Sequence, residues 1–264
     1  MRAFAAMLVM STFLSAADHT ARVEAWRAKR MAALRADDGW LTVAGLHWLK
    51  PGWNRFAELP AGLEWRWEGT TVSLRQGGQL RTLKPDNPGP ADLVQSGSLT
   101  MFVIERGGRY GIRVRDTKSR YRAQFHGIEH FPVDAKWNVT ARWNAYAQPK
   151  KRVLPTVIEG VNEVYDAPGE AEFTLEGKTF KLEPVLSGGR LFFVFRDLTT
   201  GKTTYPAGRF LYADLVEKGV VKMDFNEAYN PPCAFTPYAT CPLPLPQNRL
   251  AIAVEAGEKN YHLE

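Results

Sequence analysis

The chain has 264 residues, with 34 lysines and arginines against 28 aspartates and glutamates, so its net charge is only +6. Hydrophobic residues make up 45%, charged residues 23% and aromatic residues 12% of the chain, which excludes a disordered, collagen-like or coiled-coil protein. The 22 glycines and 17 prolines favour many short elements joined by turns over a helical bundle. The weak, unclustered positive charge argues against a nucleic-acid partner.

The chain begins with a pattern typical of a secretory signal peptide. Arg2 precedes an uncharged apolar run from Ala3 to Leu14, and the small residues Ser15 and Ala17 suit the positions before a signal peptidase cut. The run is too short to span a bilayer, which needs about 20 residues. We therefore expect residues 1–17 to be removed and the rest to be exported, periplasmic or secreted, without a transmembrane segment. A buried N-terminal helix is the alternative.

An amphipathic helix is predicted from Thr20 to Arg35, in an N-terminal segment of residues 18–36. The apolar residues at helical spacing are Val23, Trp26, Met31 and Leu34. Arginines and lysines fill the other positions. We expect this basic face to be solvated while the apolar face docks on a sheet, with binding to anionic lipids as the alternative.

After Gly39 the pattern changes to the two-residue period of β-strands, with Gly, Pro or Asn turn signals between the runs. In the first half, the predicted strands are residues 40–49, 63–67, 71–75, 99–105, 110–115, 131–133 and 139–146. In the second half, they are residues 163–165, 170–175, 178–184, 191–197, 208–213, 220–224 and 250–255.

The predicted fold class is mainly β, with the N-terminal amphipathic helix followed by two packed antiparallel β-sandwich or barrel-like lobes. Two loose segments, Lys84–Pro90 and Gln148–Pro155, are candidate boundaries. We assign residues 37–135 to the first lobe and residues 136–264 to the second, which includes a proline-rich closing loop at residues 224–249. The absence of a fixed-period repeat argues against propellers and solenoids.

The stretch from Asp224 to Lys259 is aperiodic and dense in proline and polar side chains. Rigid backbone of this kind either preorganises a site or fixes a connection. The candidate catalytic residues, as acid or base, are Asp224 and Glu258. The candidate ligand-binding residues are Asn226, Tyr229, Asn230, Arg249 and Lys259. The structural alternative is that the Asn and Asp side chains bond to turn backbone and that Arg249 pairs with Asp224 or Glu258.

Cys233 and Cys241 are the only cysteines and lie in the same loop. In an oxidising compartment we expect them to form a disulfide, because the spacing and the prolines allow their Cα atoms to come within reach. A reactive or metal-bound thiol pair is the alternative, although a structural zinc site needs two further ligands.

No motif indicates a metal or a cofactor. His126 and His130 are four residues apart, but no Glu follows His126 as a metalloprotease motif requires, and Pro132 would end a helix. The chain also lacks a nucleophile elbow, a phosphate-binding glycine loop and a dinucleotide fingerprint. We therefore expect no cofactor.

Six stretches of sequence together carry a family resemblance. They are WLTVAGLHWLKPGWNRF near the start, FHGIEHFPVD in the middle, TTYPAGRFLYADL, and then DFNEAYNPPCAF, ATCPLPLPQNRL and AGEK. With these motifs the chain resembles the bacterial domain-of-unknown-function family numbered 1684, over roughly Trp26 to Lys259. The family brings no established activity, so the resemblance implies a domain and an informative segment without a mechanism.

Three functional hypotheses follow. The first is an exported β-rich protein that binds a small polar or anionic ligand at the closing proline and cysteine loop. The second is a small-molecule hydrolase using Asp224 or Glu258 and a bound water, which predicts both carboxylates in one cleft with a displaced pKa. The third is a structural envelope module whose loop is packed shut. We favour binding, because no catalytic constellation is recognisable, and leave open whether the protein is an enzyme.

Overall fold

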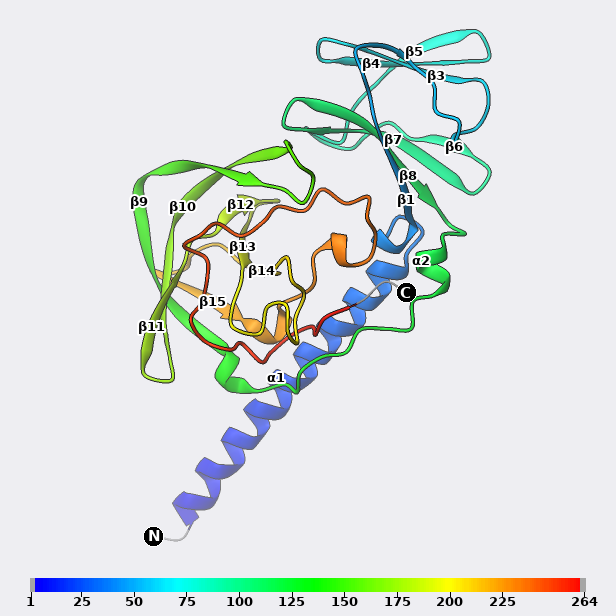
Figure 1. Ribbon diagram of the computed structural model, residues 1–264. Helices are drawn as coiled ribbons and strands as arrows, with labels where there is room; N and C mark the ends of the chain where they lie inside the picture. The colour runs from blue at the N-terminus through cyan, green and yellow to red at the C-terminus, as the bar shows by residue number, and fades with distance from the viewer. Residues whose placement is uncertain (1–2, 262–264) are drawn as a thin grey trace.

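The computed structural model describes residues 3–261, and within this range the protein is mainly β, as predicted. One long helix, α1 (Ala3–Arg35), runs beside two groups of antiparallel sheets (Figure 1). Short helical turns, η1 (Trp40–Thr42), α2 (Arg120–Ala123), η2 (Ala135–Trp137), η3 (Phe225–Glu227) and η4 (Pro232–Ala234), connect them. Residues 1 and 2 of the predicted signal peptide lie outside the described residues.

The first lobe consists of two four-stranded sheets. One has the order β1 (Val43–Trp48), β8 (Arg109–Asp116), β7 (Leu99–Arg106) and β6 (Val94–Ser96). The other has the order β2 (Gly52–Asn54), β3 (Leu63–Glu68), β4 (Thr71–Gln76) and β5 (Gln79–Leu83). The two sheets share a core in which Trp65 packs in a cluster with Met101 and Ile112. The sequence analysis missed β2, β5 and β6, which are short or mostly exposed and so lack an alternating apolar signal.

The second lobe is built around a long antiparallel hairpin. Its first sheet has the order β11 (Lys178–Leu182), β10 (Asn162–Leu175), β9 (Asn138–Pro155) and β15 (Val220–Asp224). Its second sheet has the order β12 (Val185–Ser187), β13 (Arg190–Phe195) and β14 (Arg209–Ala213). Phe193, Phe195 and Phe225 are fully buried in the shared core, and the closing loop passes over these sheets (Figure 1).

The segment Gln148–Pro155, predicted as a loose boundary, is instead the end of strand β9. It pairs with β10, where Pro155 lies opposite Asn162 and Arg152 opposite Tyr165. The side chains of residues 147–151 are all exposed, so this arm of the hairpin carries no apolar alternation, although residues 150–155 pair with β10.

Two further predicted strands do not form ladders. Residues 131–133 lie outside any strand. Residues 250–255 also form no strand and make only isolated backbone hydrogen bonds with the segment around Arg196 and Leu198. Leu250 donates to the carbonyl of Arg196 at 2.8 Å, and Leu198 donates to the carbonyl of Ile252 at 3.0 Å. These contacts bury alternate side chains, Leu250 and Ile252, which explains the strand-like pattern of the sequence. Likewise, the predicted strand at residues 40–49 begins as the helical turn η1.

Helix α1 docks through the predicted apolar positions, with Val23 and Leu34 buried. Contrary to expectation, part of its basic face also turns toward the protein. Arg27 donates to the carbonyl of Phe131 at 2.9 Å. Arg22 and Arg30 donate to carboxylates of the closing segment, residues 224–259. No helix within residues 3–261 has the combination of length and hydropathy needed to cross a membrane.

Candidate functional site

The two candidate catalytic carboxylates hold different turns of helix α1. Oδ2 of Asp224 lies 2.7 Å from Nε2 of His19 and also accepts from Arg22. Glu258 is 0% exposed and accepts a hydrogen bond of 3.1 Å from Nε of Arg30. Arg22 and Arg30 are eight residues apart in the helix, about 12 Å along its axis at about 1.5 Å per residue. The geometry therefore does not pair the two carboxylates across one cleft.

Burial raises the pKa of Glu258 above its usual value, against the opposing charge of Arg30. The backbone N–H of Asn230 also donates to this carboxylate, at 2.7 Å. A displaced pKa was expected for a catalytic carboxylate, but here its cause is enclosure between helix α1 and the closing segment.

The two candidate asparagines are held by backbone groups. Nδ2 of Asn226 donates to the carbonyl of Asp134 at 2.9 Å and to Oδ1 of Asp224 at 2.7 Å. Nδ2 of Asn230 donates to the carbonyl of Lys259 at 2.7 Å. These contacts fix the course of the chain, as the structural alternative predicted for the asparagines.

The other candidate residues also have defined surroundings. The guanidinium of Arg30 lies 4.5 Å from the ring centroid of Tyr229. Nζ of Lys259 lies 3.3 Å from Glu129. Arg249 is exposed, and no ion pair among the described residues joins it to Asp224 or Glu258, so the expected pairing of this arginine does not form.

A cleft of about 600 Å³ lies elsewhere, between the two lobes. The first lobe contributes residues 86–87 and the β7–β8 turn, the second lobe contributes residues 162–165 at the start of β10, and the closing loop contributes Pro232 and residues 240–242. The lobes meet at Gly107, whose φ is +58° and where a Cβ would lie 2.5 Å from the carbonyl oxygen of Asn162. Only glycine fits this contact.

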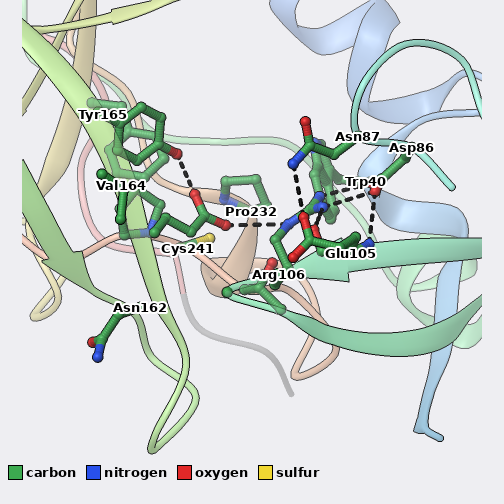
Figure 2. A pocket seen from close by; sticks show the side chains of 15 residues that line it. Trp40, Asp86, Asn87, Glu105, Arg106, Asn162, Val164, Tyr165, Pro232 and Cys241 are labelled. Carbon is green, nitrogen blue, oxygen red and sulfur yellow. Dashed lines mark hydrogen bonds and ion pairs between the residues drawn. The ribbon is translucent and has the colours of Figure 1, made fainter. Parts of the chain in front are cut away.

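Arg106 connects the two lobes across the cleft. Its Nη1 and Nη2 each donate to Asp86 at 2.8 Å, and its Nε lies 3.2 Å from Glu163. Tyr165 donates to the same glutamate, and Figure 2 shows the resulting chain of contacts from Tyr165 to Arg106 and Asp86. Burial alone would lower the pKa of Arg106, but its hydrogen bonds to Asp86 and the nearby carboxylate charges raise it above its usual value. Burial raises the pKa of Tyr165, and Glu163 adds to this effect.

Arg113 is a buried cation beside the same cleft, with only 3% of its surface exposed. Its Nη2 lies 3.3 Å from Oγ1 of Thr240, and its guanidinium lies 5.2 Å from the ring centroid of Trp40. Both Thr240 and Trp40 line the cleft. Among the described residues no carboxylate forms an ion pair with Arg113, and its buried Nε has no hydrogen-bond partner.

Burial, together with the charge of Arg106, lowers the pKa of Arg113 to about 10, and the nearby charge of Asp86 opposes this shift. The group is therefore still protonated at neutral pH, as arginine almost always is in proteins. A buried charge without a carboxylate partner is costly, which gives Arg113, in contact with the cleft-lining residues Trp40 and Thr240, the clearest need for an anionic partner.

The strand pattern explains why Arg113 is buried. On β8, Ile112 and Val114 point into the core of the first lobe, so Arg113 lies on the opposite face, where it pairs in register with Phe102. The neighbouring β7 carries a continuous buried apolar run, Met101–Ile104, which is typical of a strand covered on both faces. The sequence analysis missed Arg113, and this apolar run is the signal that could have found it.

Cys233 and Cys241 lie side by side, and Cys241 lines the cleft. The N–H of Cys233 donates to Sγ of Cys241 at 3.2 Å, and the hydroxyl of Tyr205 donates to the carbonyl of Cys233 at 3.0 Å. Both cysteines are free thiols in this structure, so the predicted disulfide is not formed in it. The hydrogen bond with Cys241 lowers the pKa of Cys233, while burial raises that of Cys241.

His126 and His130, considered above as a metal site, differ in their exposure to solvent. His126 is exposed, whereas His130 is partly buried and forms a backbone bridge with Glu258. Within the part of the chain that the structure describes, no group of three or more His, Cys, Asp or Glu side chains is arranged to hold a metal ion.

With this fold and cleft defined, comparison with known proteins gives the class of the chain. A family model described as "Protein of unknown function (DUF1684)" matches residues 123–259, slightly more than half of the sequence. The chain belongs to this family. The match covers the second lobe and the closing segment, whereas the motif at residues 40–56 lies before it.

Among solved structures, the chain is similar to an uncharacterized protein of Haloarcula marismortui determined by solution NMR. The two are 32% identical, the match covers 52% of this chain and 78% of the other, and the TM-score is 0.44. No curated protein matches the chain.

Proposed function

We propose that the protein binds a small organic anion in the cleft between its two lobes, with Arg113 as the buried positive charge that recognises it. The observation that carries this proposal is the guanidinium of Arg113, which is 3% exposed, contacts two cleft-lining residues and has no carboxylate partner among the described residues. Ligand clefts typically combine apolar walls with a few convergent polar groups, and this one fits that description.

A bound anion would relieve the cost of burying this charge. Leaving an ion unpaired in a protein interior costs several kcal/mol, by order of magnitude, and an arginine forms strong charge-assisted hydrogen bonds with carboxylates and phosphates. The apolar walls, including Trp40 and Phe210, would exclude water and strengthen that interaction. The closing loop would take part through Pro232 and residues 240–242, as the first hypothesis expected of its proline and cysteine region.

The two alternative functions have less support. A small-molecule hydrolase based on Asp224 or Glu258 requires these carboxylates to reach a substrate, yet each is held by cationic groups of helix α1. A purely structural envelope module would have no use for an open cleft with an uncompensated buried cation beside it.

Export and the disulfide remain part of the proposal. The apolar start of the chain favours export to a periplasmic or extracellular location. In such an oxidising compartment, the thiols of Cys233 and Cys241 would pair, because the two residues are already in contact through the hydrogen bond from the N–H of Cys233 to Sγ of Cys241. Mass spectrometry of the protein isolated from the cell envelope, with and without thiol alkylation, tests both points together.

The anion site is tested by titrating the protein with acetate, butanoate, hexanoate and inorganic phosphate, followed by two-dimensional NMR. We expect at least one of these probes to shift amides of residues 240–242 and of the β7–β8 turn, and Arg113→Gln to weaken its binding at least tenfold. Arg109→Gln is the matched control, because Arg109 lies on the same strand but its guanidinium lies over Trp48, which does not line the cleft, whereas that of Arg113 contacts the lining residues Trp40 and Thr240. Equal binding by wild type and Arg113→Gln would contradict the proposal.

A further inference from the structure

Resting on the anion site proposed above, we propose that the ligand is a zwitterion, with its anionic group at Arg113 and a cationic amino group at the acidic rim of the same cleft. The acidic rim is defined here as Asp86, Glu105 and Glu163, all of which line the cleft. The ligand class is therefore that of amino acids and other amino carboxylates.

The acidic rim carries more negative charge than its own cation can neutralise. Arg106 is the one cationic side chain in the cleft lining, and it already contacts both Asp86 and Glu163. Two carboxylates thus share a single guanidinium. The guanidinium of Arg106 is thus already engaged by two carboxylates. The carboxylate oxygens of Asp86 and Glu163 can still accept further hydrogen bonds.

Glu105 adds a carboxylate with no cationic partner among the described residues. Its Oε2 accepts from Nδ2 of Asn87 at 2.8 Å, and its Oε1 accepts from the backbone N–H of Gly108 at 2.6 Å. Both donors are uncharged. The two hydrogen bonds hold the carboxylate in one orientation beside Arg106 and leave its full negative charge to attract a cation.

The buried guanidinium of Arg113 supplies an opposite charge next to the cleft, in contact with the lining residues Thr240 and Trp40. Its contacts with Thr240 and Trp40 put it on the side of the closing loop and η1, whereas the acidic rim belongs to the β7–β8 turn, the β5–β6 connection and β10. A ligand with only an anionic group would meet the repulsion of the rim, and a ligand with only a cationic group would leave Arg113 unpaired. A molecule with both groups satisfies both places.

The lining also carries apolar side chains, with Val164, Phe210 and Pro242 among them. A volume of about 600 Å³ is within the usual range for small-ligand pockets. The spacer between the amino and acid groups of the ligand is accordingly expected to be hydrocarbon rather than polar.

Matched pairs of probes test this inference. We would measure binding of glycine, 4-aminobutanoate and 6-aminohexanoate against acetate, butanoate and hexanoate, with butylamine and hexylamine as cation-only probes, by NMR titration of the full chain. For at least one chain length, we expect the amino acid to bind at least tenfold more tightly than the acid without the amino group. The series of lengths is needed because the amino group must reach the rim while the carboxylate occupies Arg113.

Two variants assign the two ends of the ligand. Glu105→Gln keeps an oxygen to accept from Gly108, so the turn is retained, and it should remove most of the advantage of the amino acid while leaving the binding of the simple acid unchanged or improved. Arg113→Gln should weaken acid and amino acid by the same factor.

The outcomes separate this inference from the proposed function. If the simple acids bind through Arg113 and no amino acid gains over its matched acid, the zwitterion is wrong and the anion site stands. If the amines bind and the response is independent of Arg113, both are wrong and the cleft is a cation site. If no probe of the series binds, the zwitterion inference is overturned, and phosphate binding decides the anion site separately.

Discussion

Two buried arginines, Arg209 in the core of the second lobe and Arg113 beside the cleft, occupy opposite electrostatic situations. Arg209 is 1% exposed, and its Nη2 donates to Asp197 and to the carbonyl of Val254, each at 2.8 Å, while its Nη1 donates to the carbonyl of Ala256. Arg113 is almost equally buried, but its side chain has one hydroxyl contact of 3.3 Å and, within residues 3–261, no ion pair with a carboxylate.

The difference separates a structural charge from a charge available for binding. Around Arg209 the protein supplies the counterion and the acceptors itself, so the guanidinium ties the closing segment to the sheet. Around Arg113 the protein supplies an aromatic ring and a hydroxyl, both from residues that line the cleft. Burial alone therefore does not tell a structural arginine from a binding one. The difference lies in how many hydrogen-bond acceptors and carboxylates the protein itself places around the guanidinium.

The largest effect on stability should come from Arg209→Met. The substitution leaves Asp197 buried without its counterion, which typically costs about 3–5 kcal/mol of unfolding free energy. Chemical denaturation of the variant measures this loss. The double variant Asp197→Asn with Arg209→Met removes both charges and should recover part of it, and a failure to recover any would show that the pair does not act as a unit.

A somewhat smaller loss, about 2–4 kcal/mol, is expected for Arg30→Met, because Glu258 then has only the N–H of Asn230 as a partner. Removing the cation also raises the pKa of Glu258 further, so the loss should be largest at neutral pH and shrink as the carboxyl protonates in acid. Denaturation at several pH values checks both the size and the slope. Lys29→Met, at an exposed position of the same helix, is the control and should change little.

A pH effect is expected from His130. Burial lowers its pKa from 6.5 to about 4, and the charge of Arg27 contributes. Because the folded-state pKa lies below the unfolded one, His130 reduces stability as pH falls from about 6.5 to about 4, where the unfolded chain takes up the proton first. Thermal unfolding across this window should show a shallower loss for His130→Gln than for wild type. The exposed His126 provides the control, since His126→Gln should leave the slope unchanged.

The smallest change in stability should come from Arg113→Met. This substitution removes a buried charge that has no counterion, so the unfolding free energy should stay the same or rise, by up to about 2 kcal/mol. A loss of the size expected for Arg209→Met would erase the contrast between the two arginines and would count against a binding role for Arg113.

The fold class was predictable because local patterns determine it. The apolar positions Val23 and Leu34 indicated the docked face of α1, and two-residue alternation indicated most of the long strands. The arm of β9 at residues 148–155 was missed because most of its side chains are exposed, and its pairing depends on a strand that follows it. Alternation detects burial, so paired but solvated backbone escapes it.

The candidate site was only partly predictable, because its partners are remote in sequence. The closing loop, singled out for its prolines and polar side chains, contributes Pro232 and residues 240–242 to a cleft, but none of the candidate catalytic or ligand-binding residues lines that cleft. Asp224 contacts Arg22 of α1, which lies 202 residues earlier in the chain. Glu258 contacts Arg30 of α1, which lies 228 residues earlier. Spacing within a loop cannot reveal such partners, and the same limit hid the burial of Arg113.

The hairpin of β9 and β10 forms one wall of the cleft, and the β7–β8 turn forms the wall that faces it. Residues 162–165 pair with residues 152–155 of β9, and beyond one bulge at Ala167 the same strand continues into the core with Phe173. Moving β10 outward would strain the β9–β10 ladder, because that ladder continues into the core. The facing β7–β8 turn is held to β10 by the ion pair of Arg106 with Glu163 and by the contact at Gly107. Opening of the cleft at this place would have to break the ion pair of Arg106 with Glu163, so the rate at which a ligand leaves should depend on how often that ion pair breaks.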